Sequence, residues 1–280
     1  MMVMSWKFIG KTDCVMRFLS IASGSSGNCL YVGSDCTHIL VDTGISCKRT
    51  IEGLNGIDVK PEELDGIFIT HEHADHIAGL GVLSRKYGIP IYATKGTIEG
   101  IKESTSLGKI DDSLFNEVKA DSKITVKDLV INPMHISHDA NEPVAYRVKC
   151  EDKKIGIITD LGVFDEYTVG CLQGMDLIMA EANHDIRMLE AGPYPYYLKK
   201  RILSDRGHLS NENSGRLISK ILHDDMKGII LGHLSFENNL PDLAYETVRL
   251  EITASDTPYT GNDFPLYVAK RDCPIKAIEI

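Results

Sequence analysis

The densest group of metal-binding side chains in the chain is Thr70-His71-Glu72-His73-Ala74-Asp75-His76, which directly follows one apolar run and directly precedes another. This arrangement predicts a strand that delivers ligands to the start of a helix. Because a strand alternates its side chains, His71 and His73 face the same way and can bind one ion. Asp75 and His76 begin the helix on a different side of the turn, where they can reach a second ion a few Å away.

The ligand types favour a dinuclear centre of divalent ions. Imidazole suits Zn²⁺ and its neighbours in the transition series, and a carboxylate extends the range to Mn²⁺, with Fe²⁺ also compatible. The alternative is a polar loop whose histidines only cap and solvate the helix. A His-x-His-x-Asp-His pattern after an apolar strand rarely arises for that reason alone, so two divalent metal ions are the working hypothesis.

The stretch 129–143 offers two further histidines, either of which could join His71 and His73 as a ligand of the first ion. Three imidazoles and one open position for water form a common catalytic arrangement. His135 and His138 are an odd number of residues apart, so a strand through both would place them on opposite faces. We favour His138 because it lies where the strand passes into a loop, and we expect His135 to be a core or surface residue.

Two later strands also end in ligand residues. The strand Lys154–Ile158 leads to Asp160, whose two carboxylate oxygens can bridge two ions; a helix N-cap is the alternative role. The apolar run 228–232 ends at His233, which would complete the second ion together with Asp75, His76 and Asp160.

Two other segments and one further histidine could take part in binding or catalysis, but ordinary structural roles also explain them. The loop Ser23–Asn28 could form an anion-binding nest of backbone N–H groups, or it could be a flexible hairpin turn. Pro193–Arg201 joins aromatic rings to a basic cluster, as in sites that stack bases, but it could equally be an amphipathic helix with a solvated face. His38 lies within a strand and is expected to be a packed or surface histidine.

These motifs resemble the metallo-β-lactamase superfamily and, within it, the WalJ/YycJ-type bacterial exonucleases and phosphodiesterases. The resemblance extends from about Arg17 over nearly the whole chain. It implies an α/β fold, the αββα sandwich, in which two mixed β-sheets pack face to face with outer helices. It also implies a 5′-to-3′ DNA exonuclease with a role in DNA repair. The motifs that carry it are Ser23–Asn28, Thr70–His76, His138–Ala140, Thr159–Gly162, Glu181–Asp185, Gly207–Asn211 and His233–Asn239.

The resemblance also suggests roles for residues around the ions. An aspartate at the position of Asp42 steadies the metal loop by hydrogen bonds. By analogy with the related tRNA nucleases, Glu181 and His208 would supply a proton to the leaving 3′ oxygen. His184 could serve instead or bind an extra ion. Asp75 would also orient the attacking water, while His208 would help to stabilise charge on the phosphate.

Bulk properties are those of an ordinary globular protein. The chain has 280 residues, 43% of them hydrophobic and 25% charged, and it contains no apolar run long enough to cross a membrane. We predict one domain over residues 1–280, with residues 1–16 as a peripheral tail. The seven cysteines are scattered without a Cys-x-x-Cys pair, which favours reduced thiols and a cytoplasmic protein.

The net charge of −10 weighs against sequence-independent binding of long DNA. It weighs only weakly against chemistry on one phosphodiester, because two divalent ions would make the centre locally cationic. The resemblance implies nucleic acid, and DNA ends in particular, as the partner.

Local patterns complete the expected architecture. We expect a single helix from Asp75 to Tyr87, closed by Gly88, and only surface helix and loop between Thr94 and Lys123.

Several other functions are compatible with the same ligands. A thioester hydrolase would need a C-terminal helical substrate domain, and an RNA endonuclease would need a long protruding arm; neither is evident in the sequence. A common β-lactamase places Cys where this chain has Asp160, which disfavours lactam hydrolysis. A catalytically inactive metal-binding regulator is disfavoured by the complete ligand set.

Overall fold

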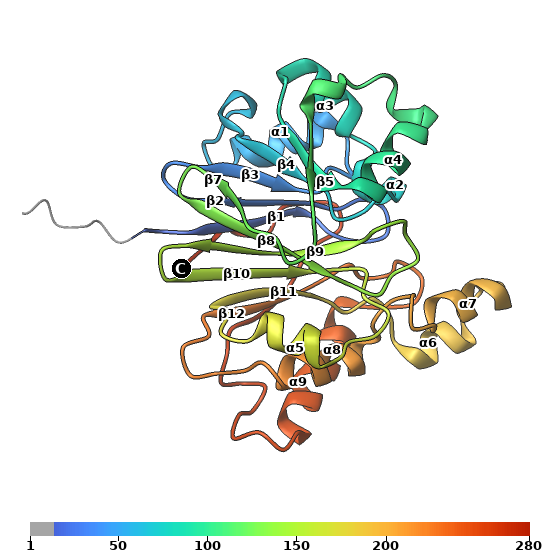
Figure 1. Ribbon diagram of the computed structural model, residues 1–280. Helices are drawn as coiled ribbons and strands as arrows, with labels where there is room; N and C mark the ends of the chain where they lie inside the picture. Colours follow the sequence, from blue (N-terminus) through green and yellow to red (C-terminus); the bar gives the residue numbers. More distant parts are fainter. Residues whose placement is uncertain (1–13) are drawn as a thin grey trace, which may run out of the picture.

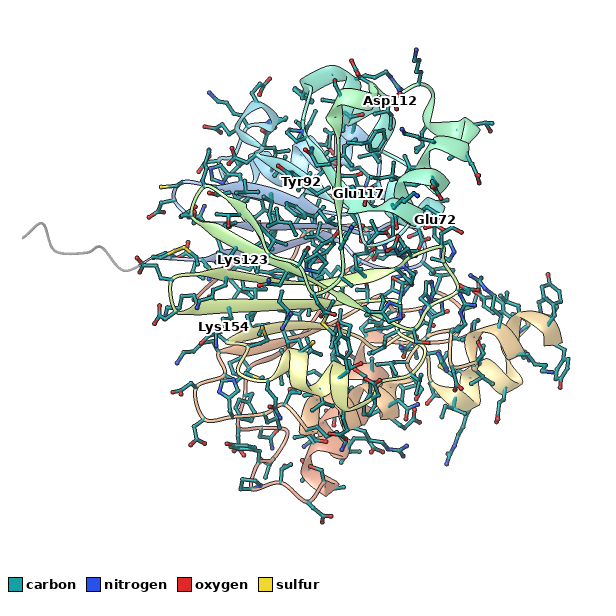
Figure 2. The ribbon with its side chains drawn as sticks, viewed as in Figure 1. Glu72, Tyr92, Asp112, Glu117, Lys123 and Lys154 are labelled. Carbon is teal, nitrogen blue, oxygen red and sulfur yellow. A yellow bond between two sulfur atoms is a disulfide. The ribbon has the colours of Figure 1, made fainter. Side chains whose placement is uncertain are left out.

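The computed structural model describes residues 14–280, which form two mixed seven-stranded sheets packed face to face (Figure 1). Helices cover the outer faces of both sheets, as the sequence predicts. Figure 2 shows side chains filling the space between the sheets, where a core cluster includes Phe18, Phe68 and Tyr146. One further apolar cluster lies between each sheet and the helices that cover it.

The first sheet has the strand order β14-β1-β2-β3-β4-β5-β6. Neighbours are antiparallel from β14 to β3 and parallel from β3 to β6. The strands are β1 Arg17–Ala22, β2 Cys29–Gly33, β3 His38–Val41, β4 Gly66–Phe68, β5 Ile91–Thr94, β6 Phe115–Val118 and β14 Ile278–Glu279.

The second sheet has the order β13-β12-β11-β10-β9-β8-β7. Here β7 to β10 are antiparallel neighbours, and β10 to β13 are parallel. Their bounds are β7 Ile124–Val126, β8 Leu129–His135, β9 Val144–Cys150, β10 Lys153–Ile158, β11 Leu177–Glu181, β12 Gly228–Gly232 and β13 Leu266–Val268.

The helices form two outer layers and one projection. Figure 1 shows α1, α3 and α4 over the first sheet, α5, α8 and α9 over the second, and α6 and α7 extending beyond the sheets. No helix among residues 14–280 has the length and apolarity needed to span a membrane. The helices are α1 Cys47–Asn55, α2 Ala74–Ile77, α3 Leu80–Tyr87, α4 Lys95–Glu103, α5 Glu166–Leu172, α6 Ile186–Ala191, α7 Tyr196–Ile202, α8 Asn211–Ser219 and α9 Pro241–Ala254, with short 3₁₀ turns at Pro61–Glu63, Thr105–Leu107 and Asp112–Leu114.

Two local predictions need correction. The expected single helix from Asp75 to Tyr87 is two helices, α2 and α3, because the chain turns at Gly79. A Cβ at Gly79 would lie 2.0 Å from the carbonyl oxygen of Ile45, so this close approach requires glycine. The segment between Thr94 and Lys123 is not only helix and loop, since it contains the edge strand β6, most of whose side chains are exposed or only half-buried.

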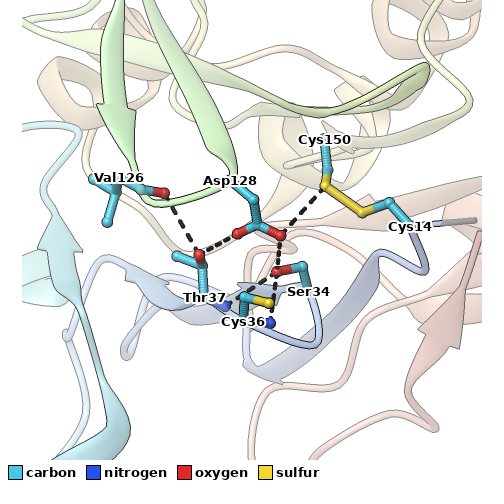
Figure 3. The surroundings of a disulfide bond; sticks show 7 residues. All are labelled: Cys14, Ser34, Cys36, Thr37, Val126, Asp128 and Cys150. Carbon is cyan, nitrogen blue, oxygen red and sulfur yellow. Dashed lines mark hydrogen bonds between the residues drawn. A yellow bond between two sulfur atoms is a disulfide. The ribbon is translucent and has the colours of Figure 1, made fainter. Parts of the chain in front are cut away.

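The N-terminal segment and the cysteines differ in part from expectation. Most of the predicted tail, residues 1–13, lies outside the described residues, but Met16 is fully buried and its backbone pairs with Ile280. Cys14 forms a disulfide with Cys150 at the end of β9 (Figure 3), so the expectation of reduced thiols is wrong for this pair. The sequence could not reveal this pairing, because the two cysteines are 136 residues apart and meet only when the sheets stack.

Candidate metal centre

The predicted ligands lie at one edge of the sandwich because the strands that carry them run in the same direction. Strands β4 and β3 are parallel in one sheet, and β8, β10 and β12 run alike in the other. Their carboxyl ends therefore meet at a common edge, as expected for ligand sites in sheets of this kind. The residues that follow these five strands include Asp42, the Thr70–His76 motif, His138, Asp160 and His233.

Three of these positions have an unusual backbone conformation. Asp42, Asp160 and His233 have φ angles of 60°, 57° and 56°, which lie in the left-handed region. This region costs a residue other than glycine on the order of 1 to 3 kcal/mol, and such strain concentrates at functional sites. All three residues follow strand ends, where the turn directs their side chains towards the shared edge.

His71, His73 and His138 form the first ligand group. One donor atom from each lies within 4.8 Å of the others, and Nε2 of His138 is 3.3 Å from Nδ1 of His73. Nε2 of His71 is fully buried and has no hydrogen-bond partner among the described residues. An unpaired buried polar atom is costly, and a bound cation would satisfy it. The structure thus brings together the three imidazoles predicted for the first ion.

Glu72 and His135 turn away from this group. Glu72, labelled in Figure 2, accepts a 2.8 Å hydrogen bond from the backbone N–H of Asn141 and so anchors the neighbouring loop. His135 is exposed at the end of β8, in agreement with the choice of His138 as the ligand candidate.

Asp75, His76 and His233 form the second group, and Asp160 lies between both groups. Oδ2 of Asp75 is 3.4 Å from Nε2 of His76 and 3.3 Å from Nε2 of His233. The carboxylate of Asp160 is 3.1 Å from His76, 3.5 Å from His233 and 3.8 Å from His138. Asp160 therefore has the position of a ligand shared by two ions.

In two candidate ligand histidines, the ring nitrogen Nδ1 faces a neighbouring hydrogen-bond acceptor. Nδ1 of His76 lies 2.8 Å from Asp42, whose other oxygen accepts the backbone N–H of Thr70. Nδ1 of His138 lies 3.1 Å from the Gly207 carbonyl. Such contacts fix the tautomer and direct the other ring nitrogen at a metal.

The carboxylates here are buried opposite histidines rather than lysines or arginines. Asp42, Asp160 and Glu181 are at most 2% exposed, and every ion pair they form within residues 14–280 is with histidine. Burial alone would lower the pKa of His233, but nearby carboxylates, Asp160 first, raise it to about 10. Burial would raise the pKa of Asp160, but His233 and His76 hold it well below its usual range. No lysine or arginine of residues 14–280 forms an ion pair with these buried carboxylates, and divalent cations at the same position would balance their charge.

Glu181 links His208 to the second ligand group. Its Oε1 lies 2.8 Å from Nδ1 of His208 and 2.9 Å from Nδ1 of His233, and its Oε2 accepts backbone N–H groups from Leu161 and Leu209. Burial would raise the pKa of Glu181, but His208 and His233 outweigh it and lower the pKa to about 2. Glu181 is therefore ionised and acts as an acceptor that orients two imidazoles.

His184 is separate from these contacts. It is 1% exposed, neither ring nitrogen has a hydrogen-bond partner in the described structure, and it does not line the cavity at the site. Burial lowers its pKa to about 4. The structure therefore gives His184 no direct contact with a reacting group.

The site opens into a cavity of about 210 Å³. His208 lines it beside His73, Asp75, Asp160 and His233. Of the other lining residues, only Ile202 lies outside the segments that the sequence analysis singled out, although none of the others was assigned there to the predicted ligand set. The remaining lining residues are Ser25, Asn183, Tyr194, Leu198, Arg201, Ile202 and Ser235.

Comparisons with known proteins agree with the fold and the motifs. Residues 37–226 match the family model described as the beta-lactamase superfamily domain. The chain is 40% identical to the exodeoxyribonuclease WalJ of Streptococcus pneumoniae, over 94% of this chain and 98% of the relative. It is also 40% identical to the exodeoxyribonuclease YycJ of Bacillus anthracis, over 83% and 88% respectively. The crystal structure of the metallo-beta-lactamase fold protein YhfI from Bacillus subtilis is similar with a TM-score of 0.70 and 18% identity, over 95% of this chain and all of that one.

Proposed function

Because this chain belongs to the metallo-β-lactamase superfamily, we propose that it is a metal-dependent exodeoxyribonuclease that hydrolyses DNA from the 5′ end. The single observation that carries the proposal is the position of Asp160, which lines the cavity and lies within 3.8 Å of four histidines. The similarity of the chain to two relatives that are named exodeoxyribonuclease, over most of their length, supports DNA as the substrate.

The ligand assignment follows from the two groups of donor atoms. Two divalent ions, when bound, would activate a water molecule and stabilise charge on the phosphate oxygens. In this proposal the ions are Zn²⁺, Mn²⁺ or Fe²⁺, since histidine and aspartate suit all three. One ion would be held by His71, His73 and His138, and the other by Asp75, His76 and His233, with Asp160 shared by both.

His208 is the proposed proton donor to the leaving 3′ oxygen. Its side chain is 15% exposed, lines the cavity and is held by the ionised Glu181. A proton donor must reach the leaving oxygen, and His208 is accessible whereas Glu181 is fully buried. Glu181 therefore positions His208 and does not itself deliver the proton. Asp75, 26% exposed at the same cavity, would orient the attacking water.

The proposed activity fits a role in DNA repair in the cytoplasm. An exonuclease that needs a free 5′ end would act on broken or processed DNA, which fits a role in DNA repair. A cytoplasmic location would place it with the bacterial chromosome.

The test is a comparison of substrates with purified full-length protein and Mn²⁺, with and without chelator. The set contains 5′-phosphorylated linear duplex, closed circular DNA, a precursor tRNA and a thioester. We expect chelator-sensitive loss of the linear DNA alone, with a 5′ label released as short products before a 3′ label. Preferential cleavage of the tRNA or the thioester would overturn the proposal in favour of that chemistry.

A further inference from the structure

The helices α6 and α7 and their connection, residues 186–202, form an arm that projects beyond the two sheets (Figure 1). Four arm residues, Tyr194, Leu198, Arg201 and Ile202, line the cavity that also contains Asp75 and His208. One wall of the candidate metal centre is therefore built by the arm, and a substrate that reaches the cavity must pass it.

The arm carries the two most exposed aromatic side chains of residues 14–280. Tyr196 is 76% exposed and Tyr197 is 75% exposed. Neither ring contributes to the core, so folding gives no reason for two adjacent aromatic residues here. Nζ of Lys200 lies 5.8 Å from the Tyr196 ring centroid, which places a cation beside the exposed aromatic surface.

The arm is also locally basic on an acidic chain. The whole protein has 30 Lys and Arg against 40 Asp and Glu. The arm, residues 186–202, reverses this balance, because its only acidic side chain is Glu190 while its basic ones are Arg187, Lys199, Lys200 and Arg201. Exposed aromatic rings beside basic groups are the combination that holds single-stranded nucleic acid, by stacking on bases and by contacts to phosphates.

Arg201 connects the arm to the metal ligands. Its guanidinium binds both carboxylate oxygens of Asp139, with 2.9 Å between Nη2 and Oδ1. The same Oδ1 lies 3.4 Å from Nε2 of His138. Two of its five N–H groups bind Asp139, so the guanidinium is held at the cavity with further donors for a phosphate.

We propose that the arm is the strand-holding element of the nuclease: bases of a single-stranded DNA segment stack on Tyr196 and Tyr197, and Lys200 and Arg201 contact the phosphates that lead into the cavity. This inference rests on the proposed function. At 3.6 residues per turn, residues four apart lie on the same face of a helix, so Tyr196 shares a face of α7 with Lys200 and Tyr197 shares a face with Arg201. Each exposed ring therefore has a cation on its own side of the helix.

The decisive measurement separates strand binding from metal chemistry. Fluorescence anisotropy with a 5′-phosphorylated single-stranded DNA in chelator measures binding without turnover. Hydrolysis of bis(p-nitrophenyl) phosphate with Mn²⁺ measures the metal centre, because this small diester does not extend along the arm. For Tyr196→Ala/Tyr197→Ala we expect a Kd for DNA at least tenfold higher and small-diester hydrolysis within twofold of wild type.

Matched controls identify the property that matters. Val82→Ala/Leu250→Ala removes two other exposed apolar side chains, 52% and 56% exposed, on α3 and α9 and should leave both measurements unchanged. Tyr196→Phe/Tyr197→Phe should retain binding, because the stacking rings remain. Lys200→Glu should weaken DNA binding and reduce its salt dependence, whereas Lys48→Glu, on α1 with a side chain 84% exposed, should not.

The two proposals fail in different ways. If wild type hydrolyses the small diester but no DNA, the proposed function is wrong. If wild type degrades DNA and Tyr196→Ala/Tyr197→Ala binds the strand as tightly as wild type, the arm proposal is wrong. A parallel loss of small-diester hydrolysis in this variant would assign the arm a structural role and would also overturn the proposal.

Discussion

The two ends of the sandwich each hold a carboxylate in different surroundings, exposed at one end and buried at the other. At the end that holds the disulfide, Asp128 accepts hydrogen bonds from Ser34 and Thr37 beside Cys14–Cys150 (Figure 3). Hydroxyl groups satisfy its oxygens, and burial, which would raise its pKa, is outweighed by these bonds. At the other end Asp160 faces only histidines, and its backbone lies in the left-handed region.

This difference indicates that the end with Asp128 stabilises the fold and that the end with Asp160 binds a ligand. The hydroxyl groups of Ser34 and Thr37 satisfy both oxygens of Asp128, so this carboxylate stabilises the structure without a bound ligand. The Asp160 end contains an unpartnered nitrogen on His71 and buried carboxylates whose ion-pair partners within residues 14–280 are all histidines. A protein tolerates such an arrangement where a ligand completes it. Substitutions at the two ends should therefore affect different properties.

The largest effect is expected when the shared carboxylate loses its charge. Asp160→Asn should reduce the bound divalent metal to about one ion per chain or fewer and lower hydrolysis by about 10³-fold or more, on the order of 4 kcal/mol. Metal analysis by mass spectrometry and hydrolysis of a small phosphodiester would measure both. Asp128→Asn is the matched substitution at the opposite end and should leave both within twofold. Full metal content and activity in Asp160→Asn would contradict the assignment.

The next largest effect distinguishes His208, the proposed proton donor, from the metal ligands at the same end of the sandwich. His208→Ala should lower kcat for DNA by about 10² to 10⁴-fold, because the proposed proton donor is lost. The metal content should stay near that of wild type, since His208 is outside both ligand groups. Steady-state kinetics and metal analysis on the same preparation would check this. Loss of an ion together with activity would make His208 a ligand instead.

A smaller effect, on stability rather than activity, is expected at the opposite end. Cys14→Ser/Cys150→Ser removes a cross-link that closes a loop of 136 residues and should lower the free energy of unfolding by about 2 to 4 kcal/mol. Urea unfolding without reductant would measure it. Activity and metal content of the folded variant should equal those of wild type. A variant that folds normally but loses metal would show that the two ends are coupled.

The two ends also differ in how far the sequence could predict them. The convergence of the candidate ligands at one end was predictable because their residue types are chemically distinctive and each follows an apolar strand whose end lies at the shared edge. The disulfide was not, because no local pattern connects Cys14 with Cys150. Nor was the position of Arg201, since its contact with Asp139 depends on how α7 packs. The break at Gly79 was missed because it arises from a close approach to Ile45, which only the folded chain reveals.

The smallest effect compares a histidine from each end through the pH dependence of stability. His38, near the disulfide end, has its Nδ1 2.7 Å from the Tyr31 hydroxyl, whereas His184 is buried without a partner and its pKa is lowered to about 4. The unfolded chain takes up a proton at His184 below its ordinary pKa of 6.5, and the folded chain does so only near 4. Stability from this residue is therefore fully present at neutral pH and is lost as the pH falls.

Linkage gives the size of this effect. Between pH 7 and pH 5, His184 should remove about 2 kcal/mol of unfolding free energy. His184→Asn does not titrate, so the difference in stability between wild type and this variant should change by about that amount over the same range. Urea unfolding of both proteins in chelator measures the change, because chelator removes the pH dependence of metal binding from the comparison. His38→Asn should show a weaker dependence, since His38 is only partly buried. Equal pH dependence in wild type and His184→Asn would mean that the pKa of His184 is the same in the folded and the unfolded chain. This result would contradict its burial without a partner.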